Sequence, residues 1–268
     1  MIAASFNVNG LRARIDILSQ WIAEARPDVV ALQETKVPDE KFPDDAIRPL
    51  LGHVIYGGEK SYNGVALLTR REPDEAVLGF EGDESSRSRL VAVRLGDLWV
   101  VNTYVPQGYE VGHERFAFKL NWLAKMKEWF AGRFDPARDN VLWMGDLNVA
   151  PTELDVYDPK RMEGKVCFSD DEKRALADIV DWGFVDIFRK HEPGEKQFSF
   201  FDYRLPKSVD RKLGWRIDHL LATPPLAERS TRAWIDLAPP RPPQTHDPTP
   251  PPPPTPPHPV LHRRQNNS

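Results

Sequence analysis

Short apolar runs alternate with longer amphipathic stretches over most of this chain. Runs that are apolar at nearly every position predict buried strands, whereas apolar residues every three or four positions predict helices. Ser169 fits the N-cap position of the last such helix. We therefore predict helices at 12–25, 113–131 and 170–182, and strands at 2–6, 28–33, 64–69, 90–95, 98–104, 141–144, 215–222 and 233–237. The opening strand, helix and strand resemble a βαβ unit.

Acidic and amide residues recur where the predicted strands end. Asn7 and Glu34 follow the first two strands, Asp146 and Asn148 follow 141–144, and Asp218 lies inside 215–222. Several oxygen ligands could meet at one edge of a sheet, which suits Mg²⁺, a cation that takes few carboxylates, several waters and substrate phosphate. A carboxylate beside an amide can also orient an attacking water and stabilise charge that develops during phosphoryl transfer.

Each of these residues has a purely structural alternative. Asp146 and Asn148 could cap a loop through an Asx-turn, and Glu34 could be a solvated strand end. The structural alternative is weakest for Asp218, because a buried carboxylate is costly unless it is paired or bound to a metal.

Composition narrows the class of protein but not its partner. A chain of 268 residues with 40% apolar residues can build one large α/β domain or two small ones, and its single cysteine excludes a disulfide framework. We find no signal peptide and no transmembrane segment, and we expect a cytoplasmic monomer. The net charge of −4 neither requires nor excludes nucleic acid, because basic residues form local groups such as Arg87 and Arg89.

The order of the motifs carries a resemblance that no single motif does. The segments FNVNGLRAR, PDVVALQETK, NGVALLTR, VNTYVPQG, MGDLNVAP, FSFFDYR and GWRIDHLLAT together resemble the exonuclease III branch of the endonuclease/exonuclease/phosphatase superfamily, over residues 1 to about 237. The resemblance implies an α/β (α+β) fold, a four-layer α/β/β/α sandwich of two stacked, mainly antiparallel sheets flanked by helices. It also implies a DNA repair nuclease that uses Mg²⁺, or Mn²⁺ in its place, at abasic sites and 3′ ends of duplex DNA.

The same resemblance assigns roles to the metal-site residues. Glu34 would be the metal carboxylate, and Asn7 would bind the metal or the scissile phosphate. Asp146 would position and deprotonate the attacking water. Asn148 would hydrogen-bond the phosphate and complete the metal-binding set.

Further residues are expected around this centre. Tyr104 would assist at the phosphate or the leaving group, and Asp218 would belong to the catalytic network or a second metal position. For DNA binding, the resemblance points to Trp215 against the abasic sugar and Arg216 at a phosphate. Asn9 and Arg87 complete the expected DNA-binding set.

The chain departs from this family after residue 238. Relatives end in Ser-Asp-His and a closing strand, whereas residues 239–268 hold 13 of the 26 prolines and contain no Ser-Asp-His. We therefore expect a domain at 1–238 without its last strand, followed by a proline-rich tail that cannot fold by itself. Loss of a phosphate-contacting His would lower the rate by about 10²–10³-fold. His246 and Asp247 are poor substitutes, because the surrounding prolines cannot form a central strand.

The abrupt change of composition after residue 238 motivates the hypothesis of a frameshift near codon 238. Translating the other two reading frames tests it, and the absence of Ser-Asp-His from both would overturn it. Three other interpretations remain open: a catalytically dead DNA-binding or misfolded remnant, a phosphodiesterase acting on a phosphoinositide or sphingomyelin, and a tail that evolved as a docking segment.

Overall fold

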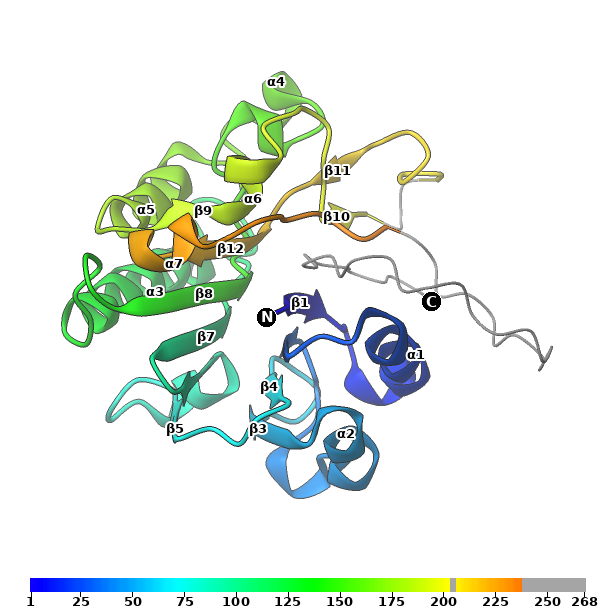
Figure 1. The fold of residues 1–268 in the computed structure, drawn as a ribbon. Helices are drawn as coiled ribbons and strands as arrows, with labels where there is room; N and C mark the ends of the chain where they lie inside the picture. Colours follow the sequence, from blue (N-terminus) through cyan, green and yellow to red (C-terminus); the bar gives the residue numbers. More distant parts are fainter. Residues whose placement is uncertain (203–205, 238–268) are drawn as a thin grey trace.

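Two β-sheets stack face to face, with helices on both outer faces (Figure 1). The computed structural model describes residues 1–202 and 206–237. The first sheet has the order β1-β2-β4-β3 and the second the order β5-β6-β7-β8-β12-β9. Their bounds are β1 Ala3–Asn7, β2 Val29–Gln33, β3 His53–Gly57, β4 Val65–Thr69, β5 Glu75–Leu78, β6 Leu90–Leu95, β7 Leu98–Tyr104, β8 Asn140–Asp146, β9 Val185–Asp186 and β12 Asp218–Ala222. The predicted sandwich is confirmed.

Strand pairing is mainly antiparallel, as expected. The parallel pairs are β1 with β2 and β7 with β8, and the other pairs in these two sheets are antiparallel. The opening βαβ unit is also confirmed, because α1 (Ile15–Ala25) connects the parallel strands β1 and β2. A separate antiparallel pair joins β10 (Phe200–Phe201) to β11 (Gly214–Trp215).

The helices divide between the two outer faces. Helix α1 and α2 (Asp44–Leu51) pack on the four-stranded sheet, while α3 (Glu114–Ala131) and α5 (Asp170–Val180) pack on the six-stranded sheet. Ser169 caps α5 as predicted, and its partner in a capping box is Glu172. The short helices are α4 Pro159–Met162, α6 Ile187–His191 and α7 Pro224–Glu228.

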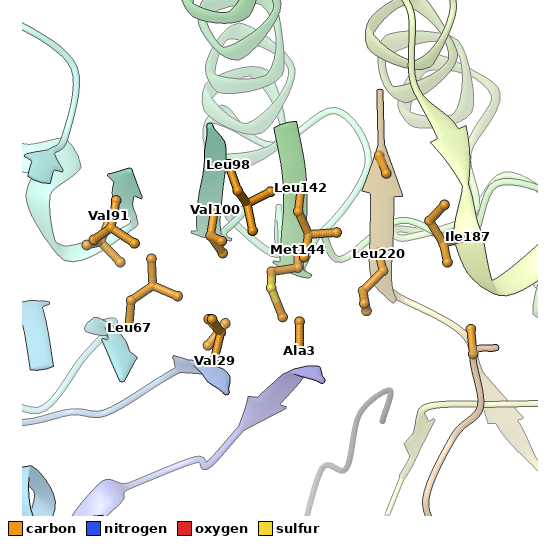
Figure 2. Packing of buried hydrophobic residues seen from close by; sticks show 14 of the residues in the cluster. Ala3, Val29, Leu67, Val91, Leu98, Val100, Leu142, Met144, Ile187 and Leu220 are labelled. Carbon is orange, nitrogen blue, oxygen red and sulfur yellow. The ribbon is translucent and has the colours of Figure 1, made fainter. Parts of the chain in front are cut away.

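A continuous apolar layer fills the space between the sheets. Figure 2 shows Ala3, Val29 and Leu67 of the first sheet pointing toward Leu142, Met144 and neighbouring side chains of the second. Leu142 and Met144 are two positions apart on β8, and side chains two apart on a strand share a face. The intervening Trp143 points to the other side, into the layer under α3 and α5.

Two predicted strands were wrong in detail. Residues 233–237 form no strand; Ile235 occupies a single bridge position, while Trp234 packs against the edge of the first sheet beside Ile2. The predicted strand 215–222 is interrupted at residues 216–217, because the chain leaves the β10–β11 pair there and joins β8 as β12. The backbone carbonyl of Ile217 instead accepts a hydrogen bond from Leu147 N at 2.9 Å.

Within the described residues, β1 lies at an edge of its sheet. A cavity of about 730 Å³ opens between the sheets there, and Ala3, Val29, Leu142 and Leu220 are among the residues that line it. The predicted boundary at 238, the proline-rich tail at 239–268 and the His246–Asp247 pair lie outside the described residues.

Candidate active site

One end of the layer between the sheets is polar. On β8 the inward positions run Leu142, Met144 and Asp146, so the apolar series ends in a carboxylate. On β1 the corresponding series runs Ala3, Ser5 and Asn7. Asp146 and Asn7 are both fully buried. The strand period of two therefore places Asn7 and Asp146 on the inward face of the sandwich.

Strand register groups three of the predicted residues. Asp146 on β8 lies opposite Tyr104 on β7 and opposite Asp218 on β12. Residues opposite each other on adjacent strands point to the same face, with Cβ atoms about 5 Å apart. The register therefore aligns Tyr104, Asp146 and Asp218 as a row across the end of the sheet.

Asn7 connects this row to the other sheet. Its side-chain Nδ2 donates to Asp146 Oδ2 at 2.8 Å and to Glu34 Oε1 at 2.7 Å. Its Oδ1 accepts a hydrogen bond from the backbone N of Asn9 at 3.0 Å. One amide thus holds the two carboxylates together, although they come from different sheets.

Glu34 has a cationic partner that sequence reasoning did not identify. Lys36 Nζ lies 2.9 Å from Glu34 Oε2 and also donates to Asn9 Oδ1. Glu34 and Lys36 both have a left-handed backbone, with φ of 52° and 55°. Lys36 stands only two residues after Glu34, which could have suggested an ion pair. Only the left-handed backbone at both residues, however, turns the lysine side chain back onto the carboxylate.

Asp146 and Asn148 form the Asx-turn that sequence analysis offered as the structural alternative. Asn148 N donates to Asp146 Oδ1 at 3.1 Å, and Asn148 has a φ of 51°. The strand has ended at Asp146, so strand alternation does not orient Asn148; its Nδ2 donates to the Val105 carbonyl at 2.9 Å. Gly145 is required before this turn, since a Cβ there would lie 2.1 Å from the Thr103 carbonyl oxygen. The turn places the amide beside the carboxylate.

Behind the site, a buried network of amide side chains joins the sheets. Gln33 Nε2 donates to Asn102 Oδ1 at 2.7 Å and to Ser5 Oγ at 3.1 Å. Asn102 Nδ2 donates to the carbonyls of Leu32 and Ala66, both at 2.9 Å. Sequence reasoning missed Gln33 and Asn102. The signal was present as isolated polar residues inside apolar strands, which must find partners when they are buried.

Tyr104 is accompanied by Arg89 rather than by Arg87. The Arg89 guanidinium lies 5.2 Å from the Tyr104 ring centroid, and Nη1 donates to the Tyr104 carbonyl at 3.2 Å. Burial lowers the pKa of Arg89, while Tyr104, Glu59 and Glu34 act in the opposite direction. Arg87, which was predicted to bind DNA, is partly exposed and lies 3.6 Å from Glu84. Its predicted role stays a prediction.

The structure contradicts the expected phosphate contact of Arg216. This side chain is 1% exposed, and its guanidinium pairs with Asp155 at 2.6 Å and with Asp186 at 2.7 Å. Burial alone would lower the pKa of Arg216, but Asp186 and Asp155 raise it overall. Arg216 is therefore an internal structural cation. The WRID pattern could not distinguish this from a DNA contact, because its partners lie far away in sequence.

His219 extends the same buried group. Its Nδ1 lies 3.1 Å from Arg216 Nη1, and its Nε2 lies 2.8 Å from the Val149 carbonyl oxygen. Burial and, to a smaller extent, the neighbouring charge of Arg216 lower the pKa of His219 to about 4. A neutral imidazole fits both contacts, accepting from Arg216 at Nδ1 and donating to Val149 from Nε2.

Trp215 and Asp218 lie on either side of the buried Arg216 in the sequence. Asp218 Oδ2 accepts a hydrogen bond from Ser199 Oγ at 2.6 Å, and the same hydroxyl accepts from Asp218 N at 3.2 Å. Trp215 stacks on Phe200 with ring centroids 5.3 Å apart. Because Asp155 and Asp186 hold Arg216, the backbone between Trp215 and Asp218 is restrained at this residue.

The site contains the carboxylate oxygens of Glu34 and Asp146 beside the side-chain amide of Asn7. Among residues 1–202 and 206–237, no group of three or more His, Cys, Asp or Glu side chains is arranged to hold a metal. The two carboxylates that Asn7 holds together, Glu34 and Asp146, nevertheless suit Mg²⁺, which keeps most of its waters and needs one or two protein carboxylates. This donor set is of the kind that binds a hard divalent cation.

Comparisons with known proteins agree with the fold, and they define the class of protein as a phosphodiester hydrolase of the nuclease type. Residues 4–258 match the model of the Endonuclease/Exonuclease/phosphatase family, and the chain belongs to this family of metal-dependent nucleases.

Similar proteins cover nearly the whole chain. Exodeoxyribonuclease III of Haemophilus influenzae is 39% identical over 246 residues, which are 87% of this chain and 91% of that protein. The structure of an AP endonuclease from Archaeoglobus fulgidus superposes with a TM-score of 0.82 at 40% identity, over 85% of this chain and 89% of that one. The 3′ phosphatase NExo from Neisseria, bound to a product DNA hairpin, gives a TM-score of 0.80 at 32% identity over 85% and 88%.

None of the helices in the described part of the chain has the length and apolar character needed to span a bilayer.

Proposed function

We propose that this protein is a Mg²⁺-dependent DNA repair nuclease of the exonuclease III type. It hydrolyses phosphodiesters at abasic sites and trims 3′ ends of duplex DNA, and it works as a cytoplasmic monomer. The observation that carries the proposal is the Asn7 amide, which donates to Glu34 and Asp146 and so assembles one site from two sheets. Relatives named as exodeoxyribonuclease III and AP endonuclease support the choice of substrate.

Asn7, Glu34, Asp146 and Asn148 would hold the metal and the scissile phosphate. A bound Mg²⁺ would neutralise phosphate oxygens and stabilise the charge that develops on the leaving oxygen. Glu34 is the metal carboxylate in this proposal. Asn7 fixes the orientation of both carboxylates through its two donated hydrogen bonds.

Asp146 accepts the proton of the attacking water and aligns that water with the phosphorus atom. Asn148, held in the Asx-turn beside Asp146, hydrogen-bonds a phosphate oxygen. Tyr104, opposite Asp146 in register, assists at the phosphate or at the leaving oxygen. Asp218, opposite Asp146 on its other side, belongs to the same network.

Trp215, Asn9 and Arg87 are the proposed DNA contacts. A flat apolar ring can fill the space left by a missing base at little unstacking cost, which favours Trp215 at the abasic sugar. Arg216 is excluded from this set, since its guanidinium is occupied by Asp155 and Asp186.

The test is cleavage of a duplex oligonucleotide with one abasic site, measured with Mg²⁺ and with EDTA. Mg²⁺-dependent incision that is lost in Asp146→Asn supports the proposal, and this variant also excludes a contaminating nuclease. Because the chain contains no Ser-Asp-His, we expect a rate about 10²–10³-fold below that of an intact relative. Soluble protein that binds abasic duplex without incising it would instead favour the DNA-binding alternative, and a noncooperative melt would favour a misfolded remnant.

A further inference from the structure

A fully buried lysine lies directly behind the Asp146–Asn148 turn and has no part in the proposed chemistry. Lys119 is on the inner side of α3, and its side chain is 0% exposed. Its ammonium donates to the Asn148 carbonyl at 2.7 Å and to the Gln107 carbonyl at 3.3 Å. The third partner is the carboxylate of Glu172 in the first turn of α5. One cation therefore connects two loops of the site to two helices.

Glu172 is itself held in place by donors from the chain before α5. It accepts hydrogen bonds from Cys167 N at 2.9 Å, from Ser169 N at 3.1 Å and from Ser169 Oγ at 2.5 Å. Its side chain is 0% exposed. A buried ion pair is tolerated when the remaining donors and acceptors of both partners are satisfied, as they are here. The Lys119–Glu172 pair is thus a rigid internal anchor.

The contact to Asn148 falls on a left-handed part of the backbone. Asn148 has a φ of 51°, in the region that asparagine adopts more readily than most residues other than glycine. Its N donates to Asp146 Oδ1, its Nδ2 donates to the Val105 carbonyl, and its own carbonyl accepts from Lys119. The lysine therefore fixes the peptide plane that follows Asn148.

Lys119 also holds the loop that contains Val105 and Gln107. Lys119 reaches the Gln107 carbonyl, and Gly108 packs so closely on the lysine stem that a Cβ there would lie 3.2 Å from Lys119 Cδ. Gly108 also needs the glycine backbone, with a φ of 97°. Because this loop starts next to Tyr104, Lys119 supports both the tyrosine and the asparagine side of the site.

We propose that Lys119, held by Glu172, is a positioning residue that fixes Asn148 and the loop after Tyr104 for catalysis. The inference rests on the proposed function, in which Asn148 contacts the scissile phosphate. Lys119 touches only protein carbonyls and a carboxylate, so it acts through Asn148. Misplacing a catalytic group by about 1 Å costs on the order of 10²-fold in rate, whereas the same shift alters folding stability little.

The decisive variant is the double substitution Lys119→Met with Glu172→Gln. Methionine removes the contact to Asn148 without leaving a charge buried alone, and the single side-chain oxygen of glutamine keeps an acceptor for Cys167 N. Replacing both members of a buried pair by neutral groups is often close to neutral for stability. Lys125→Met is the matched control, since Lys125 lies on the same helix and is 48% exposed.

Two readouts separate positioning from structural support. Cleavage of abasic duplex with Mg²⁺ should show kcat reduced on the order of 10²-fold, with KM and the melting temperature close to those of the unaltered protein. Hydrogen exchange of the amides at 147–150 should accelerate, while those of β8 stay protected. Unchanged kcat together with unchanged exchange at 147–150 would overturn the inference.

The exchange measurement also distinguishes this inference from the proposed function. If the unaltered protein does not cleave DNA, the proposed function fails, and exchange at 147–150 alone then decides whether Lys119 orders the turn. Faster exchange in the double variant supports the ordering, and equal exchange in the two proteins contradicts it. The Lys125→Met control should behave as the unaltered protein in both measurements.

Discussion

The side-chain amide of Asn7 donates to Asp146 Oδ2 across the two sheets, at 2.8 Å. Because the same Nδ2 also donates to Glu34 Oε1 at 2.7 Å, the spacing of the two carboxylates depends on how the sheets stack. A shift of one sheet relative to the other would break a buried hydrogen bond, which costs about 1–3 kcal/mol. The site and the sandwich are thus stabilised by the same contacts.

Replacing Asn7 by aspartate should make folding depend on a divalent cation. The substitution removes the donor between Glu34 and Asp146 and adds a third carboxylate, and like charges so close repel each other. We expect a lower melting temperature than that of the unaltered protein in EDTA, and partial recovery when Mg²⁺ is added. Thermal melts with and without Mg²⁺ measure this; equal shifts in both conditions would show that the cation does not bind here. Asn140→Asp, at a partly exposed position, is the control.

Substitutions of Arg89 and Arg87 should have different effects on kcat, although the two residues are only two positions apart. Arg89→Met removes the cation over the Tyr104 ring and the hydrogen bond to the Tyr104 carbonyl. We expect kcat for abasic-site cleavage to fall about 10-fold, as expected when a reacting group loses its fixed orientation. Arg87→Met should leave kcat unchanged and weaken DNA binding, with a smaller dependence of affinity on salt. Equal effects of the two variants on kcat would contradict this assignment.

The Asp155–Arg216 pair should contribute stability at neutral pH and lose it in acid. Burial alone would raise the pKa of Asp155, but Arg216 and Arg189 lower it well below its ordinary value. A carboxylate with a depressed folded pKa stabilises the fold above its unfolded pKa, near 4; this contribution declines as the pH falls below that value and is lost as the pH falls through the folded pKa. Asp155→Asn should therefore cost about 3 kcal/mol at pH 7, because a buried cation loses a charged partner.

Urea unfolding at pH 7 and at pH 3 measures the effect. The difference in free energy of unfolding between Asp155→Asn and the unaltered protein should be smaller at pH 3. Asp135→Asn serves as the control, since Asp135 is 51% exposed and its pair with Arg138 is weak. A difference that stays constant between the two pH values would mean that Asp155 does not carry its charge in the folded state.

The cavity at the edge of β1 should bind an apolar dye. It measures about 730 Å³ and is lined by Ala3, Leu142, Leu220 and Ala222, among others. A cavity of this volume lies in the range typical of small-molecule sites. We expect the folded protein to enhance the fluorescence of anilinonaphthalene sulfonate, and we expect Ala222→Leu, which fills part of the cavity, to reduce that enhancement. Absence of enhancement below the melting transition would mean that the cavity is closed in solution.

Much of the fold could be predicted from local patterns. Apolar runs identified strands such as β2, β7 and β8, and the helical spacing before Ala131 identified α3. The pattern missed β3 and β5, which are partly exposed and lack a continuous apolar run. It also joined β11 and β12 into one strand, because the break at Arg216 depends on partners that are distant in sequence.

The sequence by itself determined which residue types stand at the inward ends of the strands. Asn7 and Asp146 follow from period-two alternation, whereas Glu34 and Asp218 follow from their places just past the apolar run 28–33 and within the apolar run 215–222. Tertiary structure alone decided that Arg216 is an internal cation and that Lys36, Arg89 and Lys119 lie at the site. The reason is physical: a long cationic side chain is placed by whichever distant carboxylate, carbonyl or ring the fold brings within reach, and no local pattern records that choice.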